Sequence, residues 1–233
     1  MRIRDYFRKF FTGSKRPETS ANQTVTAHAN DATWIAASNN PFGVRVLDCR
    51  AFIANLTAWT ANREVAKQFT QARFRDGREY LDQPPKKAVQ FPANLIFPYN
   101  GAHSDGPIFM AQVMEEKWDM FLHGNRLYVA LSWTSKLVIV ATCHFLADRV
   151  EVSNIEVDDE YVNGQSNYPA QLLDFLIKSH MSRWLVAHPM PQSWLGKSTE
   201  ELAKLSFANF GRFGLFGTFE NAIGVPRALA GSF

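Results

Sequence analysis

The stretch that decides the fold is residues 127–145, LYVALSWTSKLVIVATCHF. Apolar residues occupy every second position there, first from Leu127 to Trp133 and again from Leu137 to Phe145. Because successive side chains of a β-strand point to opposite faces, this period predicts two strands. The polar pair Thr134-Ser135 between them predicts a tight turn and an antiparallel pairing.

The same pattern continues on both sides of this stretch. His123-Gly124-Asn125-Arg126 predicts a two-residue hairpin turn, with glycine at the position that needs a positive φ, so a strand precedes it. Ala147-Asp148 predicts another turn and a strand that runs to about residue 157. Val150 and Val152 are out of phase with Ile155 and Val157, which favours a bulge near Ser153-Asn154. Four antiparallel strands in chain order make a meander.

Helical patterns flank the meander. Residues 62–74 predict one helix, and Pro169 begins an apolar face that recurs at helical spacing through Trp184 and stops before Pro189. Ser198 and Glu201 match a capping box, so a last helix is expected from about residue 199. The predicted fold class is therefore α+β, with an antiparallel meander of four or more strands covered by C-terminal helices. Its predicted core face consists of Leu127, Val129, Leu131, Ile139, Cys143 and Phe145.

Two further segments have weaker patterns. Strands are expected at 44–49 and at about 93–97, each beside a proline-bearing turn. From Phe207 to Phe219 a phenylalanine recurs at every third position, with glycines among them. This density of glycine disfavours an α-helix, and we interpret the segment as irregular chain that packs its rings into the body. A strip that docks onto a partner is the alternative.

Composition and charge divide the 233 residues into unequal parts. With 46% hydrophobic and 20% charged residues the chain is typical of folded proteins, and we expect a single α+β domain over 32–233. Residues 1–16 hold six Lys and Arg residues against one acidic residue, whereas the whole chain has a net charge of only +3. They predict a basic amphipathic helix, and the small polar residues of 17–31 predict a flexible linker. The slightly acidic remainder argues against nucleic-acid binding.

The N-terminal helix suggests a contact with an anionic membrane surface or with an acidic, grooved protein partner. Docking on the chain's own body, or an organellar transit peptide in a eukaryotic host, are the alternatives. Neither a secretory leader nor a membrane-spanning helix is expected. The residues predicted to make the contact are Arg2, Arg4, Phe7, Arg8, Lys9, Phe10 and Phe11.

Motifs that would bring a cofactor or a metal are missing from the sequence. Cys49 and Cys143 lie in apolar runs, which favours two buried thiols in a reducing compartment, the cytoplasm. The histidines have neither the i, i+4 spacing nor the paired cysteines of a zinc site, and His180 is expected to be a core residue. Glycine-rich nucleotide loops and a GxSxG nucleophile motif are also missing. We therefore expect no metal and no cofactor, and leave the oligomeric state open.

The candidate cleft combines two groups of charged residues. Glu115, Lys117 and Asp119 would share one face of the first meander strand, and Asp48 precedes Arg50 closely. Carboxylates beside a lysine or an arginine could perform acid and base steps, although a solvated sheet face is the more ordinary explanation. The preferred prediction is a non-catalytic cytoplasmic binding or interaction protein, peripheral at a membrane through its N-terminal helix. The alternative is a hydrolase or transferase that uses these acidic residues in a cleft at the sheet edge.

Overall fold

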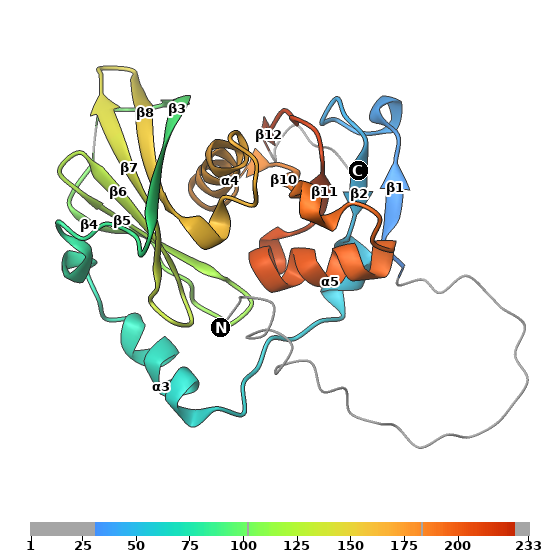
Figure 1. Cartoon of the computed structure of the whole chain (residues 1–233), viewed down its shortest axis with the longest axis horizontal. Coiled ribbons are helices and arrows are strands. Elements are labelled where there is room, and N and C mark those ends of the chain that lie inside the picture. The colour runs from blue at the N-terminus through green and yellow to red at the C-terminus, as the bar shows by residue number, and fades with distance from the viewer. Residues whose placement is uncertain (1–30, 102, 183, 227–233) are drawn as a thin grey trace, which may run out of the picture.

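The computed structural model describes residues 31–226, except 102 and 183. The predicted helix at 1–16 and the predicted linker up to residue 30 lie outside the described residues. The described chain is a mixture of helices and antiparallel strands, which confirms the α+β class. Figure 1 shows α4 between a six-stranded sheet and a smaller four-stranded sheet.

The six-stranded sheet contains the predicted meander and extends it. Its order is β3-β8-β7-β6-β5-β4, and every neighbouring pair is antiparallel. Five strands follow one another along the chain, and β3 then pairs with β8 at the far edge. The strands are β3 (Ala88–Pro98), β4 (Gly106–Phe109), β5 (Trp118–His123), β6 (Arg126–Leu131), β7 (Leu137–Phe145) and β8 (Arg149–Asp158).

One turn and one bulge of this sheet are at the positions predicted from the sequence. Gly124 has a φ of +56° in the hairpin between β5 and β6. Along β8, Val152 pairs with Cys143 and Asn154 pairs with Thr142, so Ser153 is the extra residue of a bulge. The bulge is at the predicted place, because the phase change in the apolar pattern requires one additional residue.

Two helices occupy their predicted positions and a third is shorter than predicted. Asn62 caps α3 (Arg63–Ala72), and α5 (Thr199–Phe210) has the full capping box of Ser198 and Glu201. α4 (Tyr168–Leu176) begins with proline in its first turn. The prediction that this helix runs through Trp184 was wrong, because the chain widens into a π-helical turn, η4 (Ile177–Met181), and ends there.

Short strands build the second sheet, which the sequence pattern did not indicate. The order β1-β2-β11-β10 joins β1 (Thr33–Ile35), β2 (Val46–Asp48), β11 (Phe216–Thr218) and β10 (His188–Pro189). The predicted strand at 44–49 is β2, and Asp48 pairs with Phe216 far along the chain. A separate pair joins β9 (Trp184–Leu185) to β12 (Val225–Pro226), and a short helix, α2 (Arg50–Ala54), follows β2.

Both faces of the six-stranded sheet are covered in its centre. Leu127, Val129, Ile139 and Cys143 of the predicted core face are buried, while Leu131 and Phe145 are partly buried. We call this the inner face; α4 packs against its β3 and β8 strands. On the outer face, Tyr80 of η2 (Arg78–Tyr80) packs against Phe121 and Tyr128. Over β5 and β6 the outer face is therefore shielded from water by η2.

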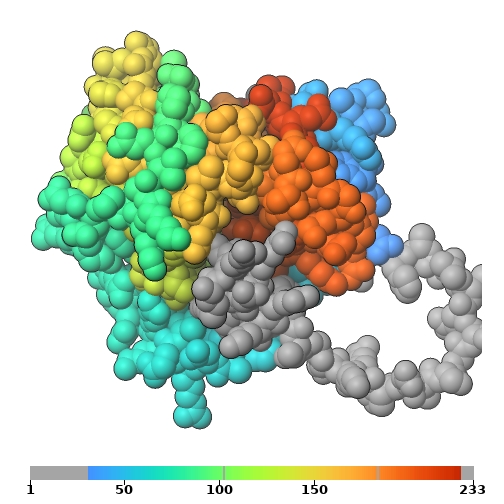
Figure 2. All heavy atoms as spheres, in the orientation of Figure 1, coloured from blue at the N-terminus to red at the C-terminus, as the bar shows by residue number. Residues whose placement is uncertain are grey.

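The phenylalanine-rich segment divides among three structures. Phe207 and Phe210 belong to α5, residues 211–213 form a 3₁₀ turn (η6), and Phe216 belongs to β11. These three rings are buried in the body. Packing of the rings into the body is thus confirmed, but the helix reaches Phe210, because the first glycine comes only after it. In the space-filling view α4 (gold) lies between the green β3 and the orange α5 (Figure 2).

Candidate functional site

The predicted acidic segment lies at the start of β5, next to the end of α5. β5 begins at Trp118, so Glu115 and Lys117 precede the strand and only Asp119 belongs to it. The solvated face that we considered for this segment was wrong: Glu116, Lys117 and Asp119 are buried, with exposed fractions of 2%, 6% and 3%. Contacts with Arg73, Trp133, Phe207 and Arg212 shield these charges from water.

Asp119 forms a buried ion pair with Arg73 at the end of α3. Both carboxylate oxygens accept hydrogen bonds from the guanidinium, at 2.7 and 2.9 Å, and the Ala111 amide donates a third at 2.8 Å. Burial raises the pKa of the Asp119 carboxyl, and Arg73 and the Ala111 amide oppose that shift. Arg73 also lies 4.5 Å from the centre of the Phe69 ring. The carboxylate thus ties α3 to the sheet.

Glu115 and Glu116 hold their loop against neighbouring segments. Glu115 accepts a hydrogen bond from the Ala58 amide at 2.9 Å, and its carbonyl accepts one from the Arg212 amide at 3.0 Å. Glu116, which the sequence pattern did not single out, pairs with the Arg212 side chain. Its side chain is less exposed than that of any predicted candidate, at 2%.

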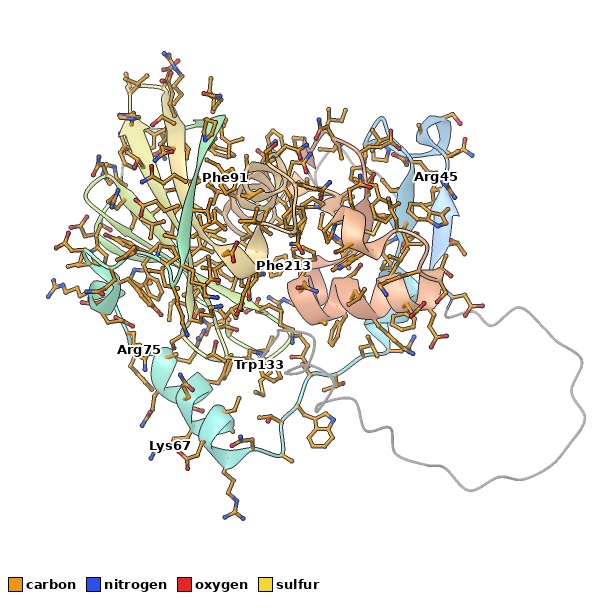
Figure 3. All side chains as sticks on the ribbon, viewed as in Figure 1. Arg45, Lys67, Arg75, Phe91, Trp133 and Phe213 are labelled. Atoms are coloured by element: carbon orange, nitrogen blue, oxygen red, sulfur yellow. The ribbon has the colours of Figure 1, made fainter. Side chains whose placement is uncertain are left out.

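Lys117 lies between aromatic rings. Its ammonium is 4.3 Å from the centre of the Trp133 ring and 5.2 Å from that of Phe207, and it donates to the Met114 carbonyl at 2.9 Å. Burial lowers its pKa to about 8, while the nearby Glu115 carboxylate opposes that shift. Figure 3 labels Trp133 at the end of the sheet that faces α3.

Asp48 ends β2 in the other sheet and binds Arg50, the first residue of α2. The Asp48 carboxylate accepts from the Arg50 amide at 2.9 Å and from its guanidinium at 2.7 to 3.2 Å. The guanidinium also lies 4.8 Å from the centre of the Phe216 ring. Between them Cys49 is buried, which raises its pKa to about 12, and both cysteines are free thiols. Among the described residues, Asp48, Glu115 and Asp119 share no hydrogen-bond partner.

A cavity of about 320 Å³ opens at the opposite end of the inner face. We call it the hairpin-end cavity, because its wall includes Leu122 and Leu127 beside the β5–β6 turn and Phe145 and Val150 beside the β7–β8 turn. Each of the six strands contributes to its lining, and η4 closes the side that faces α4. The lining residues are Phe97, Pro98, Tyr99, His103, Ser104, Ile108, Leu122, Leu127, Cys143, Phe145, Val150, Val152, Ile177, Met181 and Ser182.

The polar part of this cavity is at its rim. The ring of His103 stacks on that of Phe145 with 4.1 Å between centres, and the Tyr99 hydroxyl is hydrogen-bonded to Nδ1 of His103. Ser104 and Ser182 add two hydroxyls from the loop after β3 and from the end of η4. Among the described residues of the deeper wall, the polar group is the thiol of Cys143, whose pKa burial raises to about 11.

The π-helical turn η4 separates the cavity from a cluster of aromatic rings. Ile177 and Met181 face the cavity, whereas His180 stacks on Phe213 with 3.9 Å between ring centres. Nδ1 of His180 is 2.7 Å from the Ser179 hydroxyl, and burial lowers the pKa of this histidine to about 3. His180 is thus a core residue, as expected. Short π-helical turns occur often at functional sites, since they widen a helix locally.

No pattern in the sequence indicated the hairpin-end cavity. The predicted core face included three of its lining residues, Leu127, Cys143 and Phe145, and the predicted helix continued past Leu176, where α4 ends. Among the described residues, no three His, Cys, Asp or Glu side chains gather as metal ligands would. Within the same part of the chain, no helix has the length and apolarity to cross a membrane.

Comparison with known proteins adds no assignment. No family model matches the chain, and it has no significant match to a curated protein or to a solved structure.

Proposed function

We propose that this protein is a non-catalytic binding protein that takes a small, largely apolar molecule into the hairpin-end cavity. The observation that carries the proposal is that all six strands and η4 line one apolar space of about 320 Å³. Ligand sites in proteins are typically concave, mostly apolar and about 300–1,000 Å³ in volume, with a few polar groups that orient the ligand.

The charged residues support a binding role more than a catalytic one. Asp119 and Glu115 use their oxygens to hold α3 and the segment at Ala58 in place, and Asp48 is bound to Arg50. A general acid or base needs a proton-transfer partner in the substrate within hydrogen-bond reach. The hydrolase or transferase alternative would require these structural contacts to be given up.

The two thiols indicate the cellular compartment of the protein. Cys49 and Cys143 are buried and unpaired, which fits a reducing compartment, so we propose the cytoplasm. The membrane or partner contact through residues 1–16 remains part of the proposal. Flotation with anionic liposomes, comparing the full chain with one that starts at residue 17, tests it. Equal, salt-insensitive flotation of both chains would contradict the membrane contact.

The binding proposal is tested by thermal unfolding with neutral apolar fragments such as toluene, indole and 1-octanol. At about ten times its Kd a ligand should raise Tm by about 3–5 °C for a chain of this size. Met181→Trp, at a rim position that is 42% exposed, should block the cavity and abolish the shift.

Leu195→Trp is the matched control, since Leu195 is 56% exposed and does not line this cavity. It should leave the shift intact. Fragments that fail to raise Tm, or a shift that survives Met181→Trp, would overturn the proposal.

A further inference from the structure

The lining of the hairpin-end cavity restricts the charge of what it can hold. Among the residues that the structure describes, none that lines the cavity is Asp, Glu, Lys or Arg, and the titratable ones are Tyr99, His103 and Cys143. An ionised group that leaves water without a partner pays a large desolvation cost. A charged end of a ligand would therefore find no carboxylate, ammonium or guanidinium on the described part of the wall.

The distribution of polar atoms restricts the ligand further. From the depth outward, the wall passes from Phe97, Leu127 and Val152, which are buried and apolar, to Ser104 and Ser182, which are exposed. Neither serine hydroxyl has a hydrogen-bond partner among the described residues. A ligand with one hydrogen-bonding end would bury its apolar part and leave that end at the rim.

The volume sets the size of the ligand. At roughly 30 Å³ for each water-sized group, a space of this volume holds about ten non-hydrogen atoms. Longer acyl chains would have to project through the opening. A medium-length alkyl chain or one substituted aromatic ring fits the space.

We propose that the cavity selects an uncharged molecule of about this size, with an alkyl or aromatic body and a single hydroxyl or amide end, over the corresponding anion or cation. This inference rests on the proposed binding function and names its ligand class. The selectivity comes from the uncharged wall and from the serine hydroxyls at the rim.

The test compares three probes that share one chain: 1-octanol, octanoate and octylammonium. Their Kd values for the full-length protein are measured by calorimetry at pH 8, where the carboxylic acid is ionised and the amine is protonated. Octanol should bind at least about tenfold more tightly than either ion. The charged end of octanoate or octylammonium must either lose its water or stay outside the cavity, and both weaken binding. The Kd of octanoate should fall at pH 5, because its neutral form becomes populated.

The rim hydroxyls provide the second measurement. The double variant Ser104→Ala, Ser182→Ala should bind octanol several-fold more weakly. Its affinity for toluene, which has no hydrogen-bonding group, should be unchanged. Both serines are exposed, so the double variant should fold.

Equal affinity for the three octyl probes, or tighter binding of octanoate, would overturn the selectivity while the binding function stands. If toluene and octanol both fail to bind, the proposed function fails as well. The two failures are therefore distinguishable.

Discussion

The two ends of the inner face of the six-stranded sheet are made of similar side chains but are packed differently. At one end, Trp118 meets Tyr161 edge to face at 6.0 Å and donates its indole N–H to the Asn209 carbonyl of α5. At the other end, Leu127 and Val152 face the hairpin-end cavity. The alternation of apolar residues along each strand decides which side chains point toward the inner face. Whether the space above them is filled depends on the helix or turn that packs against that part of the sheet.

Removal of the Trp118 side chain, which fills the space at its end of the sheet, should have the largest effect on stability. Trp118→Ala should lower the free energy of unfolding by about 3–5 kcal/mol, since it leaves a void among buried neighbours and an unpaired carbonyl at Asn209. Leu127→Ala, at the cavity, should cost less, because part of its surface already faces open space. Urea unfolding of both variants measures the difference, and equal losses would contradict the contrast between the ends.

Acid should destabilise the aromatic rings around Phe175, which contacts both His180 and His188. Both are buried, Nε2 of each lacks a hydrogen-bond partner among the described residues, and burial lowers both pKa values from about 6.5 to about 3. The unfolded chain therefore binds these protons first, so the stability is fully present above pH 6.5 and falls as the pH drops towards 3.

Between pH 7 and pH 5 the loss should reach about 2 kcal/mol for each histidine, at 1.36 kcal/mol per pH unit. His180→Phe, which keeps a ring beside Phe213, should remove about half of it. Denaturant unfolding at both pH values measures the loss for each protein. A pH dependence that is the same in the variant would contradict the assignment to His180.

Two glycines with the same φ should respond differently at the two ends. Gly211 (φ +57°) follows α5, and a Cβ there would lie 1.6 Å from the Glu115 carbonyl oxygen; Gly124 (φ +56°) is in the β5–β6 hairpin, with nothing within 4 Å. Gly211→Ala should cost at least about 3 kcal/mol from strain and collision with backbone. Gly124→Ala should cost only about 1 kcal/mol, the penalty for a left-handed alanine. Similar losses in chemical denaturation would show that the α5 end and the Glu115 loop are not in close contact.

The smallest effect should come from adding volume inside the cavity and outside it. Val152 lines the cavity and Val129 does not, and both are buried. Val129→Leu should lose about 1–3 kcal/mol through overpacking, whereas Val152→Leu should be neutral or gain less than about 1 kcal/mol. Thermal unfolding ranks the pair, and a larger loss for Val152→Leu would mean that the space beside it is not available.

Sequence reasoning succeeded where structure depends on neighbours along the chain. The alternation from Leu127 to Phe145 predicted β6 and β7, the phase change predicted the Ser153 bulge, and Ser198 with Glu201 predicted the start of α5. Each of these signals lies within a few residues of the feature that it specifies.

The sequence was uninformative where distant segments meet. β2 and β11 are three-residue strands, and Asp48 pairs with Phe216, so neither has a pattern long enough to reveal its partner. Charge at Lys117 and Asp119 predicted exposure, yet Trp133 and Arg73 bury them. The hairpin-end cavity depends on how closely η4 approaches six strands, which no local pattern encodes.

The most direct test of the unequal packing and its proposed use is methyl NMR of the full-length protein during titration with 1-octanol. Saturable shifts are predicted for the methyl groups of Leu122, Leu127, Val152 and Ile177, which line the cavity. The methyl groups of Val129 and Ile139, which are buried on the same face outside the cavity, should hardly move. Shifts spread over both ends, or none at the cavity residues, would contradict the account.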